Sequence, residues 1–217
     1  MENRLKEILS SIARDGSLFE EAVLAAKERQ KILAKPTGAL GRLEDISVQI
    51  AGITGKIKNE ITKKAIIIMS ADNGVVEEGV ASAPQSVTLS QTINFIRGLT
   101  GVSSIAKHFA IDLLVVDMGV KLPIPDSLYT DTPFEDGRLP KKILKRSIAR
   151  GTNNLAAGPA MTRDQALTAI LEGVACAQAV KICGYDILGV GEMGIGNTTT
   201  SSCVLAALTK SKASDVV

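Results

Sequence analysis

Tryptophan is missing from this chain, histidine occurs once and cysteine three times. A single histidine cannot form a multi-histidine metal site. We interpret His108, which ends an apolar helical pattern, as a surface residue at a helix end rather than as the base of a Ser-His-Asp triad. The cysteines lack metal-ligand spacing, and Cys176 and Cys183 lie seven residues apart in a helical pattern. We therefore expect these two to be small buried apolar side chains, and we expect no metal.

Long apolar runs and a large excess of one charge are also missing. No run approaches the length of a membrane span, and the charged stretch from Glu2 to Glu7 does not resemble a secretory signal. The 25 basic and 23 acidic residues leave a formal charge of +2, so the charge does not indicate nucleic acid or an anionic membrane as a partner. We expect a cytoplasmic protein that binds neither.

What the chain has is aliphatic residues arranged in alternating helix and strand patterns. Hydrophobic residues make up 45% of the 217 positions, mainly Ile, Leu, Val and Ala, as buried parallel strands and their covering helices require. The patterns predict strands at 63–69, 112–116 and 185–190, and helices at 85–99, 101–109, 162–184 and 198–208. Each strand is followed by a polar turn that contains glycine. This alternation predicts a three-layer, doubly wound α/β fold with a mainly parallel sheet.

Several segments between or beside these elements have their own interpretation. Thr162 with Gln165 is a capping box at the start of the long helix, and the small and apolar residues of 198–208 suit a buried helix. Residues 121–140 are rich in proline and have no periodicity, so we expect an excursion rather than an element. Residues 141–150 are basic with apolar residues between, which favours an amphipathic segment with a solvated face.

The first residues form a separate helical pattern. Residues 1–33 predict two helices broken at Asp15-Gly16, and Ser17 with Glu20 has capping-box spacing for the second. The stretch 35–44, with one proline and two glycines, is expected to be a connector with solvated charges before helical spacing resumes at 43–53. We therefore assign a helical subdomain and connector to 1–58 and a Rossmann-like domain to 59–217.

The most informative stretch is the glycine-rich segment 186–201, where a strand pattern runs into a helix pattern. Gly191, Gly194 and Gly196 allow the backbone to approach a ligand closely. Asn197 and residues 198–200 offer side-chain caps at a helix start, where free N–H groups and the helix dipole attract phosphate. The carboxylate of Glu192 would repel an anion unless a cationic group is held there too. An ordinary strand-to-helix turn is the alternative.

Standard nucleotide motifs do not fit this stretch. No lysine follows the glycines, as a phosphate-binding loop requires, and Gly189-x-Gly191-x-x-Gly194 lacks an acidic residue on a following strand some twenty positions on. A second candidate site is the turn Asp72-Asn73-Gly74, because ligands collect outside the carboxyl ends of parallel strands. These three residue types also form plain turns, so both interpretations stay open.

Four segments together resemble nicotinate-nucleotide–dimethylbenzimidazole phosphoribosyltransferases, which make the lower nucleotide loop of cobalamin. The resemblance runs in order from about residue 5 to 217. Its segments are 35–44 (KPTGALGRLE), 71–75 (ADNGV) with 84–88 (PQSVT), 151–162 (GTNNLAAGPAMT) and 191–199 (GEMGIGNTT).

The resemblance implies transfer of the 5-phosphoribosyl group from nicotinate mononucleotide to 5,6-dimethylbenzimidazole by a homodimer without a cofactor. It implies that Glu192 stabilises positive charge on the sugar or bonds to the acceptor ring. It also implies a set of substrate-binding residues: Asp72, Asn73, Gly74, Ser82, Gln85, Gly194, Gly196, Asn197, Thr198 and Thr199.

Family members are longer, and the part that follows Val217 carries the glutamate regarded as the general base. We therefore expect these 217 residues alone to be a poor catalyst. Two other interpretations are a nucleotide-binding module without catalysis and a truncated half that needs its missing segment.

Overall fold

The computed structural model describes residues 1–15 and 18–216 of the chain. It divides into two compact units, one formed by Glu2–Ile61 and one formed by Met1 together with the residues from Thr62 onward.

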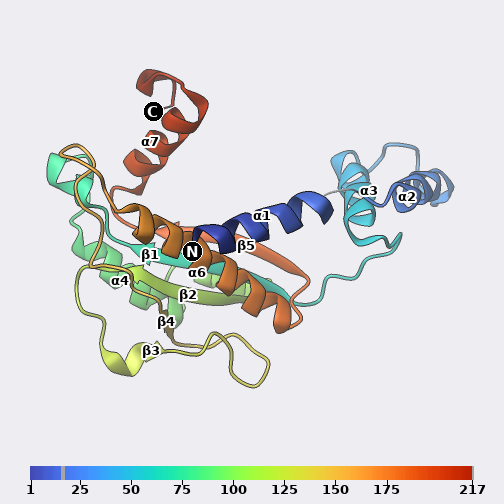
Figure 1. Ribbon diagram of the computed structural model, residues 1–217. Coiled ribbons are helices and arrows are strands. Elements are labelled where there is room, and N and C mark those ends of the chain that lie inside the picture. Colours follow the sequence, from blue (N-terminus) through green and yellow to red (C-terminus); the bar gives the residue numbers. More distant parts are fainter. Residues whose placement is uncertain (16–17, 217) are drawn as a thin grey trace. The chain divides into compact units, whose positions relative to one another are not determined.

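The larger unit alternates strands and helices along the chain (Figure 1). Short 3-10 turns follow β1, precede β3 and lie near the carboxyl end. The main elements are β1 (Lys64–Ala71), α4 (Ser86–Arg97), α5 (Gly101–His108), β2 (Ile111–Gly119), β3 (Tyr129–Thr130), β4 (Ile143–Lys145), α6 (Arg163–Ile182), β5 (Ile187–Met193) and α7 (Asn197–Thr209).

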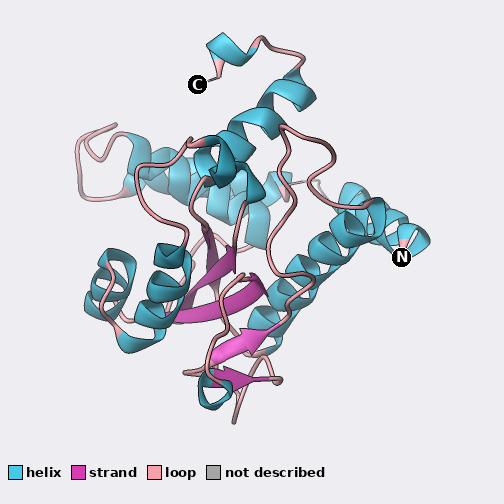
Figure 2. Cartoon of the chain, turned by 90° about the vertical axis from the view of Figure 1, so that its left-hand side faces the viewer, coloured by secondary structure: helices cyan, strands magenta, loops and turns pink. Residues whose placement is uncertain are grey.

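All pairings within the five-stranded sheet are parallel, and the strand order is β3-β4-β2-β1-β5. The strands lie side by side between helices (Figure 2). Because side chains alternate between the two faces of a strand, neighbouring residues enter different cores. Leu114 and Val116 of β2 pack on the face that α6 covers, whereas Val115 packs on the face that α4 covers. The predicted three-layer, parallel α/β fold is confirmed.

Helix α6 closes one face through apolar residues that include both predicted buried cysteines. Cys176 and Val180 pack with Ala65 and Ile67 of β1, and Cys183 at the end of the helix is also buried. The capping box is present, since the Thr162 hydroxyl accepts from the Gln165 N–H and the Gln165 side chain accepts from the Thr162 N–H. These predictions are confirmed, as is the exposed position of His108 at the end of α5.

The interpretation of residues 141–150 as an amphipathic segment with a solvated face agrees with the structure, in which the three lysines and Arg150 are exposed, but the strand within this segment was not predicted. Ile143 and Leu144 are fully buried in β4, which lies between β3 and β2 in the sheet. The charge of Arg146 is paired with Glu172 of α6, with 3.2 Å between Nε and Oε2. Strand β4 has only three residues, which is too short to show the alternation of apolar and polar residues that identifies a strand.

The buried helix expected at 198–208 is exposed instead. No residue of α7 is buried, and Leu208 is 79% exposed. The helix extends away from the sheet in Figure 1, and the short 3-10 turn Ala213–Asp215 packs against it. Strand β5 forms one edge of the sheet, where Val190 is 83% exposed.

The smaller unit consists of three helices, α1 (Glu2–Asp15), α2 (Glu20–Ile32) and α3 (Arg42–Thr54). Helices α2 and α3 pack through Ala22, Ala26 and Ala51, whose small side chains allow close approach. Helix α2 begins at Glu20 with Phe19 as the residue before it. The predicted cap residue Ser17 and the predicted break at Gly16 lie outside the described residues.

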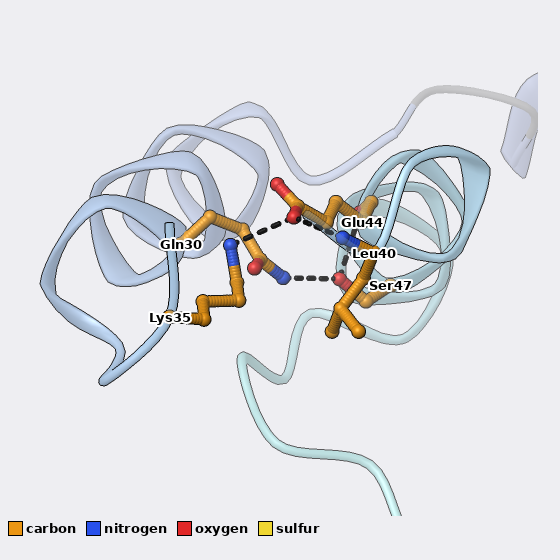
Figure 3. A network of polar contacts seen from close by, with 5 residues as sticks. All are labelled: Gln30, Lys35, Leu40, Glu44 and Ser47. Atoms are coloured by element: carbon orange, nitrogen blue, oxygen red, sulfur yellow. Dashed lines mark hydrogen bonds and ion pairs between the residues drawn. The ribbon is translucent and has the colours of Figure 1, made fainter. Parts of the chain in front are cut away.

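Charges in the connector 35–44 were predicted to be solvated, which holds for the exposed Arg42 but is wrong for Lys35 and Glu44. Lys35 Nζ lies 2.8 Å from Glu44 Oε1, and the two side chains are only 12% and 14% exposed. The same carboxylate oxygen accepts the main-chain N–H of Leu40, while Gln30 donates to the hydroxyl of Ser47 (Figure 3). The hydrogen bonds that Glu44 accepts hold the pKa of its carboxyl below the usual value, and the bond from Lys35 is the largest cause. Lys35 and Glu44 lie nine residues apart, so their pairing closes the loop. The local sequence pattern does not reveal such a pairing.

Asp186, which precedes β5, joins the start of this strand to the start of β1. Its Oδ2 accepts from the main-chain N–H of Thr62 and of Lys63, each at 2.8 Å, and from the Thr62 hydroxyl at 3.0 Å. The backbone N–H of Lys63 is the largest cause that lowers the pKa of this carboxyl from its ordinary 3.8. None of the helices in the described ranges has the length and apolarity needed to cross a membrane.

We predict that Asp186→Asn lowers the denaturation midpoint of the chain at pH 7. A carboxyl whose pKa is depressed on folding stabilises the folded state above its unfolded pKa, and this contribution is lost as the pH falls through the folded pKa. The gap between wild type and variant should therefore close as the pH falls below 3.8. Denaturant titrations across this range test it, with exposed Glu60→Gln as the charge-matched control. A gap of the same size at acid and neutral pH would contradict the assignment.

Candidate active site at the carboxyl edge of the sheet

The chain order places a crevice at the carboxyl ends of β1 and β5. From β1 the chain passes through α4 and α5 to β2 on one side, and it later returns through α6 to β5 on the other side of β1. The order therefore reverses between these two strands, and in open parallel sheets ligands bind outside such a reversal. The turn Asp72-Asn73-Gly74 follows β1, and the glycine turn that we define as residues 194–197 follows β5.

The glycine turn is bound to the turn after β1 and to α4. Asn73 Nδ2 donates to the carbonyl oxygen of Ile195 at 3.1 Å, and the Ile195 N–H donates to Thr88 Oγ1, also at 3.1 Å. Thr88 is fully buried. The Thr200 hydroxyl of α7 lies 3.4 Å from Asn73 Oδ1. These contacts make Asn73 the point where the two predicted site segments meet.

Close packing inside the protein explains why glycine occupies positions 194 and 196. A Cβ on Gly194 would lie 2.1 Å from the carbonyl oxygen of Ala71 and 2.8 Å from Asn73 Nδ2. Gly196 has a φ of 84°, a conformation that L side chains rarely adopt. The N–H of Asn197 donates to the oxygen of Gly194 at 3.0 Å. The glycines are thus required by the turn itself, whatever approaches it from outside.

The side-chain caps expected at the start of α7 are not formed. Gly196 is the residue before the helix, and no side chain caps it. Thr198 instead donates to Asn197 Oδ1 at 3.4 Å. At the start of α7 the N–H of Asn197 is bonded to the oxygen of Gly194 and that of Thr200 to the oxygen of Gly196, whereas those of Thr198 and Thr199 have no acceptor within the helix. With the positive end of the helix dipole, these groups can attract an anion next to the glycine turn.

Glu192 brings a carboxylate to the same place. It lies near the end of β5, is exposed, and its Oε1 accepts from Asn197 Nδ2 at 2.7 Å. This bond joins the strand end to the first residue of α7 and limits the directions that the carboxylate can take. The site therefore combines donors suited to an anion with one carboxylate suited to a cationic centre.

Asp72 and Gly74 are bound inside the protein. Asp72 is 1% exposed, and its Oδ2 accepts the main-chain N–H of Lys121 at 2.7 Å. The N–H of Gly74 donates to the Thr152 hydroxyl, and a Cβ on Gly74 would lie 2.5 Å from the carbonyl carbon of Asn153. The segment 151–162, which also carries the family resemblance, is therefore packed against the turn after β1.

The remaining predicted residues take different positions around this crevice. Gln85 Nε2 donates to the carbonyl oxygen of Asn73 at 3.2 Å, which brings the segment 84–88 to the site. Ser82 is exposed in the loop before α4, and Thr199 is half-buried in the first turn of α7.

Sequence reasoning missed the roles of Thr88, Thr152 and Thr200. Each belongs to or adjoins a segment that carries the resemblance, but a threonine in a loop or on a helix gives no signal of which distant group it bonds.

The turn after β2 is fixed by a buried carboxylate of its own. Asp117 is 2% exposed, and its Oδ1 accepts from the N–H of Gly119 at 2.9 Å and of Val120 at 2.8 Å. Its Oδ2 accepts from the Tyr129 hydroxyl, and burial together with this bond raises the pKa of the tyrosine. Within the described ranges, no group of three or more His, Cys, Asp or Glu is placed to hold a metal ion.

A cavity of about 160 Å³ lies beside the turns after β1 and β2, and its walls are mostly apolar. It was not predicted from the sequence. Its lining comes from the ends of these strands, from the loop before α6 and from α6 itself: Ala71, Met118, Gly119, Ile148, Ala149, Gly151, Thr152, Asn153, Ala160, Met161, Gln165 and Ala169.

The sequence and the fold are similar to those of a phosphoribosyltransferase family. A family model described as phosphoribosyltransferase matches residues 17–217. The nicotinate-nucleotide–dimethylbenzimidazole phosphoribosyltransferase of Clostridium perfringens (strain ATCC 13124) is 48% identical over 213 residues, which is 98% of this chain and 54% of that protein. The protein of the same name from Acetivibrio thermocellus is 46% identical over 93% of this chain and 54% of its own length.

A solved structure agrees with these sequence relatives. The crystal structure of the nicotinate-nucleotide–dimethylbenzimidazole phosphoribosyltransferase from Thermus thermophilus superposes with a TM-score of 0.79 at 37% identity, over 88% of this chain and 54% of that one. The chain therefore belongs to the family of nicotinate-nucleotide–dimethylbenzimidazole phosphoribosyltransferases. It spans about half the length of the curated relatives that it matches.

We predict that Gly194→Ala destabilises the chain, because the new Cβ meets a carbonyl oxygen that cannot move without disturbing β1. Overpacking of this kind costs about 1–3 kcal/mol. Denaturant unfolding measures the loss. Gly191→Ala in the preceding strand is the control, since its Cβ would meet nothing closer than 3.9 Å. Equal stability of the two variants would show that the close approach of the glycine turn to β1 is not required.

Proposed function

We propose that this chain supplies the nucleotide-binding half of an enzyme that transfers the 5-phosphoribosyl group from nicotinate mononucleotide to 5,6-dimethylbenzimidazole. The products would be α-ribazole 5′-phosphate and nicotinate, for assembly of the cobalamin nucleotide loop. One observation carries the proposal: three of the segments by which the chain resembles its family converge where the strand order reverses. Asn73 bonds to Ile195 of the glycine turn, Gln85 bonds to Asn73, and the Gly74 N–H bonds to Thr152 of the segment 151–162. We also propose that the whole enzyme acts as a homodimer in the cytoplasm.

The donor is placed at the glycine turn in this proposal. The phosphate of nicotinate mononucleotide would lie against the N–H groups at the start of α7, near Gly194, Gly196, Asn197, Thr198 and Thr199. The pyridinium and the sugar would then lie toward the end of β5. This placement is supported by the meeting of an anion-attracting helix start and the Glu192 carboxylate at one turn.

The acceptor is placed beside the turn after β1. We propose that Asp72, Asn73 and Gly74 with the loop 82–86 form the wall of the flat pocket, and that Gln85 reaches the edge of the ring. Gln85 Nε2 donates one of its two N–H groups to the oxygen of Asn73, which leaves the other N–H and the amide oxygen for the ring. Asp72 contributes as part of the wall backbone, because its side chain is buried.

The chemistry of this transfer explains a carboxylate in an anion-attracting turn. The bond from the anomeric carbon to the pyridinium nitrogen breaks, and nicotinate leaves without protonation because its ring is already cationic. Positive charge then spreads over the sugar, and Glu192 would stabilise it, most effectively where water is excluded. A benzimidazole nitrogen forms the new bond from the opposite side, which inverts the β-glycoside to α. The proton on the other nitrogen requires a general base.

We propose that this base comes from the part of the family's sequence that follows the matched half. The isolated 217-residue chain should then form α-ribazole 5′-phosphate about 10²–10⁴-fold more slowly than the complete enzyme, the usual cost of losing a general base. Adding the remaining part of the Clostridium perfringens relative as a separate polypeptide should raise the rate. Product formation from nicotinate mononucleotide and 5,6-dimethylbenzimidazole measures it.

The matched control is the first half of that relative combined with its own second half, which shows that the two halves reassemble. Full activity from the isolated chain would place the base within residues 1–217, with Glu192 the first candidate. If the control pair is active but this chain forms no product with the same second half, the proposed function is wrong. Retained binding of nicotinate mononucleotide would then favour a nucleotide-binding module.

A further inference from the structure

The glycine turn has a geometry that depends on one peptide group. Asn197 N–H donates to the oxygen of Gly194, which closes a four-residue turn with Ile195 and Gly196 at its centre. Gly196 has φ 84° and ψ 3°, the values of the third residue in a type II turn. Type II and type I turns differ chiefly in the orientation of the central peptide, here the one between Ile195 and Gly196. Rotation of that peptide would reverse the directions in which its carbonyl and its N–H point.

Two side chains, one from the turn after β1 and one from α4, bind Ile195 on both sides. Asn73 Nδ2 donates to the Ile195 carbonyl oxygen, which belongs to the central peptide. Thr88 Oγ1 accepts the Ile195 N–H, which belongs to the peptide before it. A flipped central peptide would lose the bond from Asn73. In a trans peptide the N–H points away from the carbonyl oxygen, so the N–H of Gly196 is directed away from Asn73.

The hydrogen bond from the Ile195 N–H to Thr88 involves a buried acceptor. Thr88 is fully buried, and Ile195 is half-buried. A main-chain N–H that loses a buried partner keeps its desolvation cost without compensation. Thr88 lies on α4, in the segment 84–88 that is proposed to reach the acceptor, whereas Ile195 lies in the segment proposed to bind the donor. The Thr88 hydroxyl therefore connects the segment proposed to reach the acceptor with the segment proposed to bind the donor.

We propose that Thr88 and Asn73 are positioning residues, which hold the Ile195–Gly196 peptide in the orientation that binds the nucleotide phosphate. Neither side chain needs to touch the nucleotide. They act through the turn, because the N–H groups that attract phosphate lie on the peptide they fix and on the helix that follows it. This inference rests on the proposed binding of nicotinate mononucleotide at the glycine turn.

The test compares Thr88→Val, Thr88→Ser and Thr92→Val in the whole chain, with nicotinate mononucleotide as the probe. Valine keeps the shape of threonine and removes the hydroxyl, whereas serine keeps the hydroxyl. Thr92 is the matched control, because it is fully buried on the same helix but its hydroxyl donates to the oxygen of Thr88 rather than to the turn. Calorimetry gives the dissociation constant, and amide exchange followed at Ile195 reports the bond directly.

We expect Thr88→Val to raise the dissociation constant roughly tenfold, the effect of one hydrogen bond. It should also speed exchange of the Ile195 N–H. Thr88→Ser should restore both values, and Thr92→Val should lower stability without changing either. Should Thr88→Val fail to fold, Asn73→Ala in the half-buried turn after β1 gives the same readouts, with an expected loss of affinity.

Two failures can be told apart. If wild type binds the nucleotide but Thr88→Val binds it equally well, or if Thr92→Val weakens binding as much, the positioning role is wrong and the proposed function stands. The other failure is that wild type does not bind the nucleotide while exchange at Ile195 responds to the substitutions as expected. In that case the proposed function is wrong, and so is the role of Thr88 and Asn73 in nucleotide binding.

Discussion

The close approach of Gly194 to the carbonyl oxygen of Ala71 is the constraint on which the rest of the site depends. It brings the ends of β1 and β5 so near that no side chain fits between them. At that distance Asn73 can reach the oxygen of Ile195, and Thr88 can reach its N–H. The glycine turn is thus shaped by its neighbours before any ligand arrives. A preformed site loses less conformational entropy on binding than one that must be ordered by its ligand.

The same constraint relates the residues of the family segments to one another. Gln85 holds the backbone of Asn73, Asn73 holds the glycine turn, and Glu192 is held by Asn197 at the start of α7. Residues that look like separate substrate-binding motifs in the sequence are therefore parts of one hydrogen-bonded framework. For several of these residues, the hydrogen bonds and close packing within the protein are sufficient to explain which amino acid is present. Their contact with substrate is a separate proposal.

Much of the fold could be predicted from the sequence, because strands and long helices carry periodic signals. Helix α6 has both an apolar face and a capping box, and the alternation of elements indicated the parallel sheet. The errors arose where the signal was short or depended on distant partners. Strand β4 has three residues, the pairing of Lys35 with Glu44 closes a loop, and the exposure of α7 depends on what packs against it. In the site, the turns were predictable from glycine and asparagine, but the bond from Ile195 to Thr88 spans 107 positions and leaves no local pattern.

The central claim is that the glycine turn and the start of α7 bind the nucleotide phosphate. The most direct measurement is a titration of the isotopically labelled chain with nicotinate mononucleotide, followed through the amide resonances. We predict saturable shifts at Gly194, Gly196, Thr198 and Thr199, with smaller changes elsewhere. Shifts confined to the apolar cavity beside Met118 and Met161, or no saturable shift at the glycine turn, would contradict it.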